Sequence, residues 1–224
     1  MSRYPTRDRA TGFWGAEVAL PAAVFTAAGV RVDYASPKGG AVPLDPSSDP
    51  HDPNSFGKDD PETRAFLDSA EQRAKLAATL SLENVDLGAY DAVLFAGGSG
   101  AAFDFPTDAG VQRTVRLMFE RGKVVAAICH GNAALVPARL AGGAYLVSQK
   151  STTGFSNAEE KMSGNLDGAL PFSIEDEMKA HGASYSSAAP WQSHVVRDRN
   201  LITAQQPQSA RALAVEMLRA LRGS

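Results

Sequence analysis

Short apolar segments alternate with longer segments whose apolar residues recur every three to four positions. The first pattern is typical of buried strands and the second of amphipathic helices. The helices predicted in this way cover residues 16–28, 61–80, 108–121, 173–181 and 209–222. The predicted strands are residues 30–34, 91–95 and 123–128, an extended segment or strand pair over 144–155, and a hairpin of 195–197 with 201–203. This alternation predicts an α/β fold in which helices sandwich a mostly parallel sheet.

The chain has 224 residues, which fits one large domain over residues 1–224, without an internal repeat or a linker. Its first ten residues are polar. Residues 40–61 are rich in Pro, Asp and Ser and predict a long surface loop. Loops of that length are often functional, so we expect this one to border the active site.

The composition of the chain excludes several classes of function and partner, but it does not indicate a particular activity. The net charge of -3 gives no case for nucleic acid or an anionic membrane as a partner. No apolar segment is long enough to span a bilayer, and the N-terminus lacks the apolar core of a signal peptide. A cytoplasmic protein is therefore expected. A single cysteine excludes an internal disulfide. No C-x-x-C and no H-E-x-x-H motif is present, so we expect no structural or proteolytic zinc site and no metal among the site residues; a metal in the loop region is the alternative.

That cysteine, Cys129, ends an apolar segment and is followed at once by His130, Gly131 and a helix-like stretch. A buried strand that delivers a nucleophile into a sharp turn before a helix is a nucleophile elbow. The positive end of the following helix predicts a thiolate at Cys129, which is the form of cysteine that attacks electrophiles. The alternative is a small buried side chain that only packs.

A cysteine nucleophile needs a base and an oxyanion site. His130 is a candidate base, although it could also be a partly exposed histidine at a helix start. Gly97 and Gly98 follow the strand at 91–95, and their N–H groups could approach a substrate oxygen, although a plain tight turn explains them equally. Because ligands of parallel sheets bind at the carboxyl ends of strands, the glycines and Cys129 could face one crevice.

Short motifs are spread along most of the chain, at residues 11–14 with Glu17, 35–40, 44–46, 96–98, 126–131, 153–155 with 159–160, and 201–203. Together these segments resemble the ThiJ/PfpI superfamily. The resemblance runs from about residue 11 to the C-terminus, and it is closest to the branch of heat-shock chaperones and glutathione-independent glyoxalases (glyoxalase III). It implies a flavodoxin-like fold related to class I glutamine amidotransferase domains.

The resemblance assigns roles to individual residues. Cys129 would be the nucleophile, His130 its base, and Glu160 the acid that orients His130. Glu17 would form a hydrogen bond to the thiol as a protonated acid. Gly98 and the backbone N–H of His130 would bind the oxyanion.

The remaining candidates for oxyanion or substrate binding are Gly97, Ser99, Phe155 and Trp14. Ser99 stands where this branch usually has a histidine. A serine can still donate a hydrogen bond, but it reaches less far and does not titrate near neutrality, which puts the rate or the substrate range in doubt.

A second departure concerns the start of the chain. Members of the family have an apolar strand before the segment that corresponds to residues 11–14, whereas only polar residues precede Thr11 here. We therefore expect either that the recorded start is internal to the reading frame or that the chain is a shortened form. A shortened form would be less stable, with free strand edges prone to association.

The resemblance implies a glyoxalase III-type enzyme (a D-lactate dehydratase, a hydro-lyase) that converts methylglyoxal to D-lactate without a cofactor. The same chemistry would allow protein deglycase activity. The alternative is a stress-response holdase chaperone or a cysteine-based redox sensor that needs no turnover; a peptidase or amidotransferase is a weaker reading. The expected partners are a small 2-oxoaldehyde, or a glycated or unfolded protein, and a second copy of the chain in a homodimer.

Overall fold

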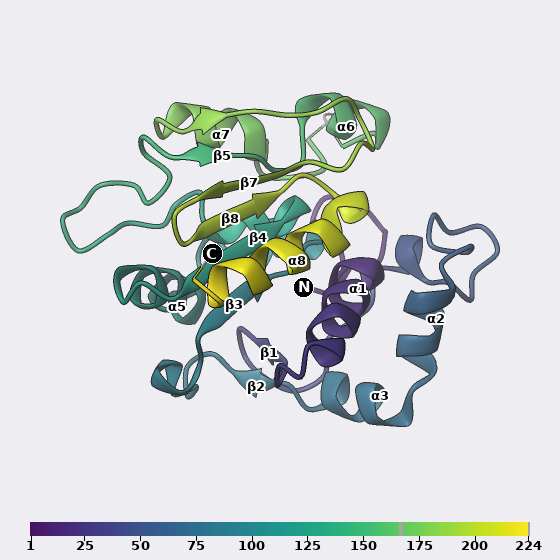
Figure 1. Ribbon diagram of the computed structural model, residues 1–224. Coiled ribbons are helices and arrows are strands. Elements are labelled where there is room, and N and C mark those ends of the chain that lie inside the picture. The colour runs from purple at the N-terminus through teal and green to yellow at the C-terminus, as the bar shows by residue number, and fades with distance from the viewer. Residues whose placement is uncertain (166–167, 224) are drawn as a thin grey trace.

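The computed structural model describes residues 1–165 and 168–223 and is organised around a four-stranded sheet (Figure 1). The strand order is β3-β4-β8-β7, in which β3, β4 and β8 are parallel and β7 is antiparallel to β8. These strands are β3 (Ala92–Phe95), β4 (Val124–Ile128), β7 (Val195–Asp198) and β8 (Leu201–Ala204). The predicted mostly parallel sheet and its terminal hairpin are confirmed.

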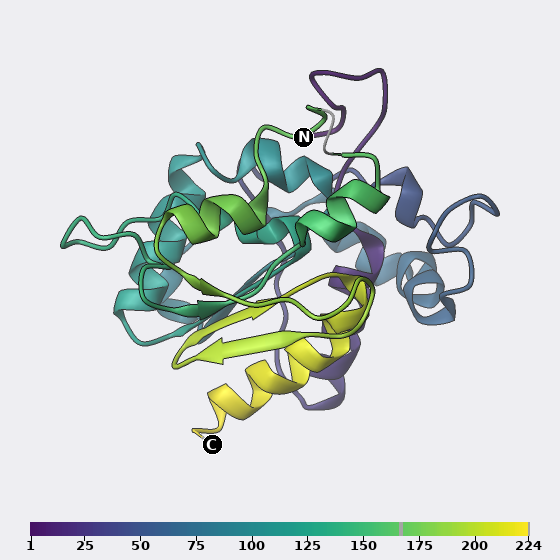
Figure 2. The same cartoon turned by 90° about the horizontal axis from the view of Figure 1, so that it is seen from above.

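Helices cover both faces of this sheet, with α1 and α8 on one side and α5 and α7 on the other (Figure 2). The sequence of β4 explains why two cores form. Val125 and Ala127 point into a core with α5 and α7, whereas Ala126 and Ile128 point into a second core with Phe25 of α1 and with α8. Because alternate residues of a strand face opposite sides, a fully apolar strand must be covered on both.

Most of the helices that the sequence predicts begin and end within a residue or two of their predicted bounds. The larger helices are α1 (Gly15–Ala27), α2 (Pro61–Asp68), α3 (Ala70–Ala77), α5 (Ala109–Glu120), α7 (Ile174–Ala180) and α8 (Ala210–Leu221). Two short helices, α4 (Ser99–Asp104) and α6 (Asn157–Met162), and the 3-10 turns η1 (Pro46–Ser48), η2 (Leu87–Ala89), η3 (Cys129–Ala134) and η4 (Pro207–Ser209) complete the helical structure.

The prediction of one helix over residues 61–80 is wrong, because the chain breaks at Ser69. This residue has an extended backbone, with ψ at 121°, and its side chain accepts a hydrogen bond from the N–H of Gln72. Serine competes for backbone hydrogen bonds in this way and is favoured at a helix start. Two helices, α2 and α3, therefore replace the expected single helix.

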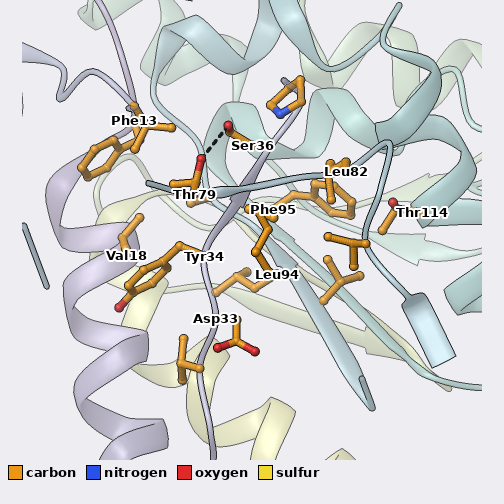
Figure 3. A pocket seen from close by; sticks show the side chains of 18 of the residues that line it. Phe13, Val18, Asp33, Tyr34, Ser36, Thr79, Leu82, Leu94, Phe95 and Thr114 are labelled. Carbon is orange, nitrogen blue, oxygen red and sulfur yellow. Dashed lines mark hydrogen bonds between the residues drawn. The ribbon is translucent and has the colours of Figure 1, made fainter. Parts of the chain in front are cut away.

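The strand expected at residues 30–34 is also absent; the chain forms strand structure only at β1 (Ala35–Ser36), which pairs with β2 (Leu80–Ser81). This small sheet is separate from the main one. A cavity of about 1420 Å³ lies between α1, residues 30–38 and β3 (Figure 3). Leu94 of β3, together with Val18 and Tyr34, lines it, so residues 30–34 have no strand beside them on that side.

Two more irregular segments differ from expectation. Within residues 144–155 only β5 (Ser151–Thr152) is a strand, and it pairs in parallel with β6 (Ser184–Tyr185). The segment 40–61 is largely irregular, as expected, but it is not wholly at the surface. Asp45 is buried and accepts a hydrogen bond from the Thr11 hydroxyl at 2.9 Å, which ties this loop to the segment that leads into α1.

Candidate active site

The turn after β4 has the geometry of an elbow. Cys129 has φ 56°, a left-handed conformation that is uncommon for a residue other than glycine, and it begins η3. A Cβ atom on Gly131 would lie 2.1 Å from the carbonyl oxygen of Phe95, so the turn can pass this close to β3 only with glycine there. Asn132 closes the turn, because its amide donates to the carbonyl of Cys129 at 3.0 Å.

The side chains of Cys129, His130 and Glu160 form a continuous chain of contacts. The Sγ atom of Cys129 lies 3.4 Å from Nδ1 of His130, and Nε2 of His130 lies 2.8 Å from Oε1 of Glu160. All three residues are buried. Because a carboxylate only accepts hydrogen bonds, it assigns the imidazole proton to Nε2 and leaves Nδ1 free to accept the thiol proton.

The short helix α6 supplies Glu160. Its N-terminus is a capping box, in which Ser156 accepts the N–H of Glu159 and the Glu159 carboxylate accepts the N–H of Ser156. The second oxygen of Glu160 accepts a hydrogen bond from Asn165 at 3.0 Å. The carboxylate is therefore held from both sides, which fixes the direction in which it faces the imidazole.

Glu17 reaches the same turn from α1. It is fully buried, and its Oε2 accepts the N–H of Gly97 at 2.7 Å. Burial raises the pKa of Glu17 to about 8, although the hydrogen bond from Gly97 and the nearby Cys129 thiol act in the opposite direction. The Oε1 atom accepts no hydrogen bond from any of the described residues.

The prediction that the fold itself favours a thiolate is wrong. Burial, and then repulsion by the Glu17 carboxylate, raise the pKa of the Cys129 thiol well above its ordinary value. Cys129 is only 3% exposed, and η3 is a six-residue 3-10 turn rather than the long helix that the thiolate prediction assumed. The thiol is therefore protonated in the resting site and has to lose its proton during the reaction.

The candidate oxyanion groups also converge on the sulfur. The N–H groups of His130 and Gly98 both form hydrogen bonds that lower the pKa of Cys129. Gly98 has φ 94°, and a Cβ there would lie 2.2 Å from the carbonyl oxygen of Gly12. A Cβ on Gly97 would lie 2.8 Å from both Glu17 Oε2 and the backbone nitrogen of His130. Only glycine fits either position.

The remaining residues that the sequence predicts for the site lie next to the glycine turn or next to His130. The backbone N–H of Trp14 donates to the carbonyl of Gly97 at 3.1 Å, so Trp14 contacts the glycine turn through its main chain. Ser99 is half-buried and begins α4 directly after Gly98. The ring of Phe155 lies against His130, with 4.5 Å between the ring centroids.

Two neighbouring aromatic residues were not predicted from the sequence. Trp191 packs edge-on against Phe155, with 5.9 Å between centroids, and lies in an irregular segment that gives no periodic pattern. Tyr4 is buried, although it lies in the polar N-terminal segment, and it packs edge-on against Phe103. A single tyrosine in a polar segment gave no signal of burial.

Within residues 1–165 and 168–223, no helix is long and apolar enough to cross a membrane. In the same residues, no group of three or more His, Cys, Asp or Glu side chains is arranged to hold a metal ion. The expectation that the protein works without a cofactor stays a prediction.

Comparison with known proteins gives a consistent picture. The family model described as the DJ-1/PfpI family matches residues 9–220. The glutathione-independent glyoxalase HSP31 of Saccharomyces cerevisiae is 29% identical over 227 aligned residues, which cover 95% of this chain and 90% of that protein.

Two solved structures share the fold along nearly the whole chain. Rapid Encystment Protein 24 kDa of Francisella tularensis is 36% identical with a TM-score of 0.91, over 98% of this chain and 94% of that one. Glyoxalase III of Candida albicans is 28% identical with a TM-score of 0.84, over 98% of this chain and 92% of that one. Since the family model spans most of its length, the chain belongs to the DJ-1/PfpI family.

Proposed function

We propose that this protein is a glutathione-independent glyoxalase that converts methylglyoxal to D-lactate, with Cys129 as the nucleophile. The observation that carries the proposal is the buried contact chain from Sγ of Cys129 through His130 to Glu160, at 3.4 and 2.8 Å. The names of the yeast and Candida relatives support the same reaction class.

The first step is addition of the thiol to the aldehyde carbon. The proton of Cys129 passes to Nδ1 of His130, and Glu160 stabilises the imidazolium that forms. The sulfur then bonds to the aldehyde carbon as the C=O π bond opens, and the oxyanion accepts hydrogen bonds from the N–H groups of Gly98 and His130. Such preorganised donors are typically worth about 3–4 kcal/mol each in the transition state. The imidazolium returns its Nδ1 proton to this oxygen, which completes the hemithioacetal and leaves His130 neutral again.

The second step moves a proton between the two carbons of the substrate. The neighbouring ketone acidifies the C–H bond of the hemithioacetal, so His130 can remove this proton to give an enediol and return it to the adjacent carbon. The product of this transfer is a thioester of lactate with Cys129. Water hydrolyses the thioester, which releases D-lactate and restores the thiol, so no external cofactor is consumed.

The raised pKa of Glu17 is consistent with these reaction steps. Below a pH of about 8 Glu17 is mainly protonated, so it does not repel a thiolate and can donate a hydrogen bond to it. The thiolate can therefore form transiently when the substrate has arrived, although burial opposes it at rest.

The test is D-lactate production from methylglyoxal in the absence of glutathione. Wild type should form D-lactate, and Cys129→Ala should form none above the uncatalysed rate. His130→Gln should also lose activity, whereas His51→Gln is the matched control, because His51 is exposed between Asp49 and Asp68. Full activity in Cys129→Ala, or no D-lactate from folded wild type, would refute the proposal.

A second candidate function is a redox-sensing or holdase role without turnover. It is favoured by the protonated Glu17 beside the only cysteine, since such an acid can donate a hydrogen bond to a sulfinate formed with two equivalents of peroxide. Absent D-lactate formation, with suppression of client aggregation that is the same in wild type and Cys129→Ala, would support the holdase role. A response to peroxide that Cys129→Ala abolishes would support the redox-sensing role. Deglycase activity, a homodimer and a cytoplasmic location remain predictions from the sequence.

A further inference from the structure

A second buried acid stands beside Glu160 and has no part in the proposed chemistry. Glu159 is fully buried, and no ion pair involves it among the described residues. Its carboxylate accepts four hydrogen bonds instead. Oε2 accepts from the N–H and the hydroxyl of Ser156 at 3.0 and 2.7 Å, and Oε1 accepts from the N–H of Trp191 and the amide of Gln205, each at 3.0 Å.

The bond to Trp191 holds an unusual backbone. Trp191 has φ 63°, a conformation that is strained for a bulky side chain and persists only where the surroundings impose it. Its segment is fixed nearby as well, because the side-chain oxygen of Gln205 accepts the N–H of Ala188 at 2.9 Å. Glu159 and Gln205 thus tie this segment to α6 and β8.

The conformation of Trp191 has a consequence at the site. It places the indole edge-on against Phe155, at 5.9 Å and 63°, and Phe155 lies against the imidazole of His130, at 4.5 Å and 35°. The two adjacent glutamates therefore reach His130 by different routes. Glu160 contacts the imidazole edge directly, whereas Glu159 is connected to its face only through Trp191 and Phe155.

We propose that Glu159 is a positioning residue for the reaction, which holds Trp191 so that Phe155 fixes the plane of the His130 imidazole for proton transfer. The effect on turnover rests on the proposed function; the effect on the imidazole does not. An imidazole that turns about its bond to Glu160 loses alignment with Sγ, and small misplacements of a catalytic group have large effects on rate.

The rival account is that Glu159 only caps α6 through Ser156. The two accounts differ in which hydrogen bonds matter. Ser156→Ala removes the capping hydroxyl and leaves the bond between Glu159 and the N–H of Trp191. Glu159→Leu introduces an apolar side chain of similar volume that has no acceptor oxygen, so it loses the bonds to Trp191 and Gln205 as well as those to Ser156.

The first measurement needs no turnover. The ring current of Phe155 displaces the C–H proton resonances of the His130 imidazole, which His130→Gln identifies among the four histidines. In Glu159→Leu these resonances should move toward those of an unstacked histidine, and in Ser156→Ala they should stay. Unchanged resonances in Glu159→Leu, or an equal displacement in Ser156→Ala, would overturn the proposal.

The second measurement is a double-mutant cycle with Trp191→Gly. Glycine adopts φ 63° without strain, so this variant should fold even if Glu159→Leu does not, and it should displace the His130 resonances by itself. We expect each single variant to lower kcat by about tenfold with KM within about twofold.

If Glu159 acts through Trp191, the double variant should be no slower than the slower single variant, whereas independent effects would multiply to about 100-fold. Multiplicative effects on kcat, or resonances unmoved by Trp191→Gly, would overturn the proposal. Absent activity in wild type with the expected displacements would refute the proposed function and leave the aromatic positioning of His130 standing.

Discussion

Nε2 of His130 lies 2.8 Å from Oε1 of Glu160, and both side chains are buried. This contact decides which imidazole nitrogen carries the proton in the neutral ring, and it leaves Nδ1 facing the sulfur of Cys129 at 3.4 Å. A base whose proton is placed in advance can take the thiol proton without reorganising.

Glu160→Gln should lower kcat by about 10²-fold or more, because an amide does not stabilise the imidazolium as a carboxylate does. KM should change little, since the carboxylate contacts the base and not the substrate. Steady-state kinetics with methylglyoxal measure both constants. Glu62→Gln is the control, because Glu62 pairs with Arg211 at the surface. A loss below about threefold in Glu160→Gln would mean that Glu160 does not orient the base.

The pH dependence of activity should show the ionisation of Glu17. As the pH rises through about 8, the carboxyl ionises and repels the thiolate of Cys129, so kcat/KM should fall. In Glu17→Gln the side chain stays neutral at every pH and this fall should disappear. Rates of alkylation of Cys129 by iodoacetamide, measured from pH 6 to pH 10, provide a second reading. An identical alkaline profile in wild type and Glu17→Gln would assign the fall to another group.

Glu17 should also make stability depend on pH, in the direction opposite to a carboxylate in an ion pair. Its pKa is about 8 in the folded protein against an ordinary value of 4.5, so the folded state holds the proton that the unfolded state loses between these values. The contribution is fully present below about pH 4.5 and is lost as the pH rises through about 8, a change of a few kcal/mol. Urea unfolding at pH 5.5 and pH 8.5 measures it, and Glu17→Gln should be less pH-dependent than wild type.

Gly98→Ala should destabilise the protein by about 2 kcal/mol or more. The substitution forces a Cβ to within 2.2 Å of the Gly12 carbonyl oxygen at φ 94°, so either the turn or the segment before α1 must move. Gly142→Ala is the matched control, because nothing lies within 4 Å of the Cβ it would add. Thermal unfolding of both variants measures the difference, and equal melting temperatures would contradict the tight contact at Gly98.

Ser69→Ala should cost about 1 kcal/mol, because it removes the side-chain acceptor for the N–H of Gln72 at the start of α3. Chemical unfolding measures the loss. Ser69→Asp should retain most of the stability, since aspartate caps helices equally well. If Ser69→Ala proved neutral and Ser69→Asp destabilising, residues 61–77 would behave as one continuous helix in solution, as the sequence predicts.

The periodic pattern of apolar residues predicts the main helices and strands correctly where burial requires those residues to be apolar. The strand before Cys129 is apolar throughout because β4 is covered on both faces, and the hairpin of β7 and β8 lies where alternation places it. The prediction of residues 30–34 as a strand failed because a strand needs a partner on its edge as well as a suitable pattern. Residues 30–34 border the cavity instead.

The site was predicted in part by chemistry and in part by resemblance. The elbow at Cys129 followed from the residues themselves, but Glu17 and Glu160 entered only through the resemblance, because nothing local distinguishes them from solvated acids. The structure brings both to the Cys129–His130 pair. The thiolate prediction failed because the sequence does not show how deeply an elbow is buried. Trp191 was not predicted as part of the site, because an irregular segment shows no periodic pattern of apolar residues.

The spacing between Phe155 and Glu160 cannot change by a single residue. Between these positions, the ring of Phe155 packs against the imidazole of His130 and helix α6 begins. The consecutive residues Glu159 and Glu160 then form hydrogen bonds with different partners. One inserted residue before Glu159 would turn everything after it by about 100° around the helix axis, so Glu159 would take the place of Glu160 and Glu160 would take the place of Lys161. The exposed tip at residues 141–143, in contrast, is a place where an insertion tag or a fused reporter should be tolerated.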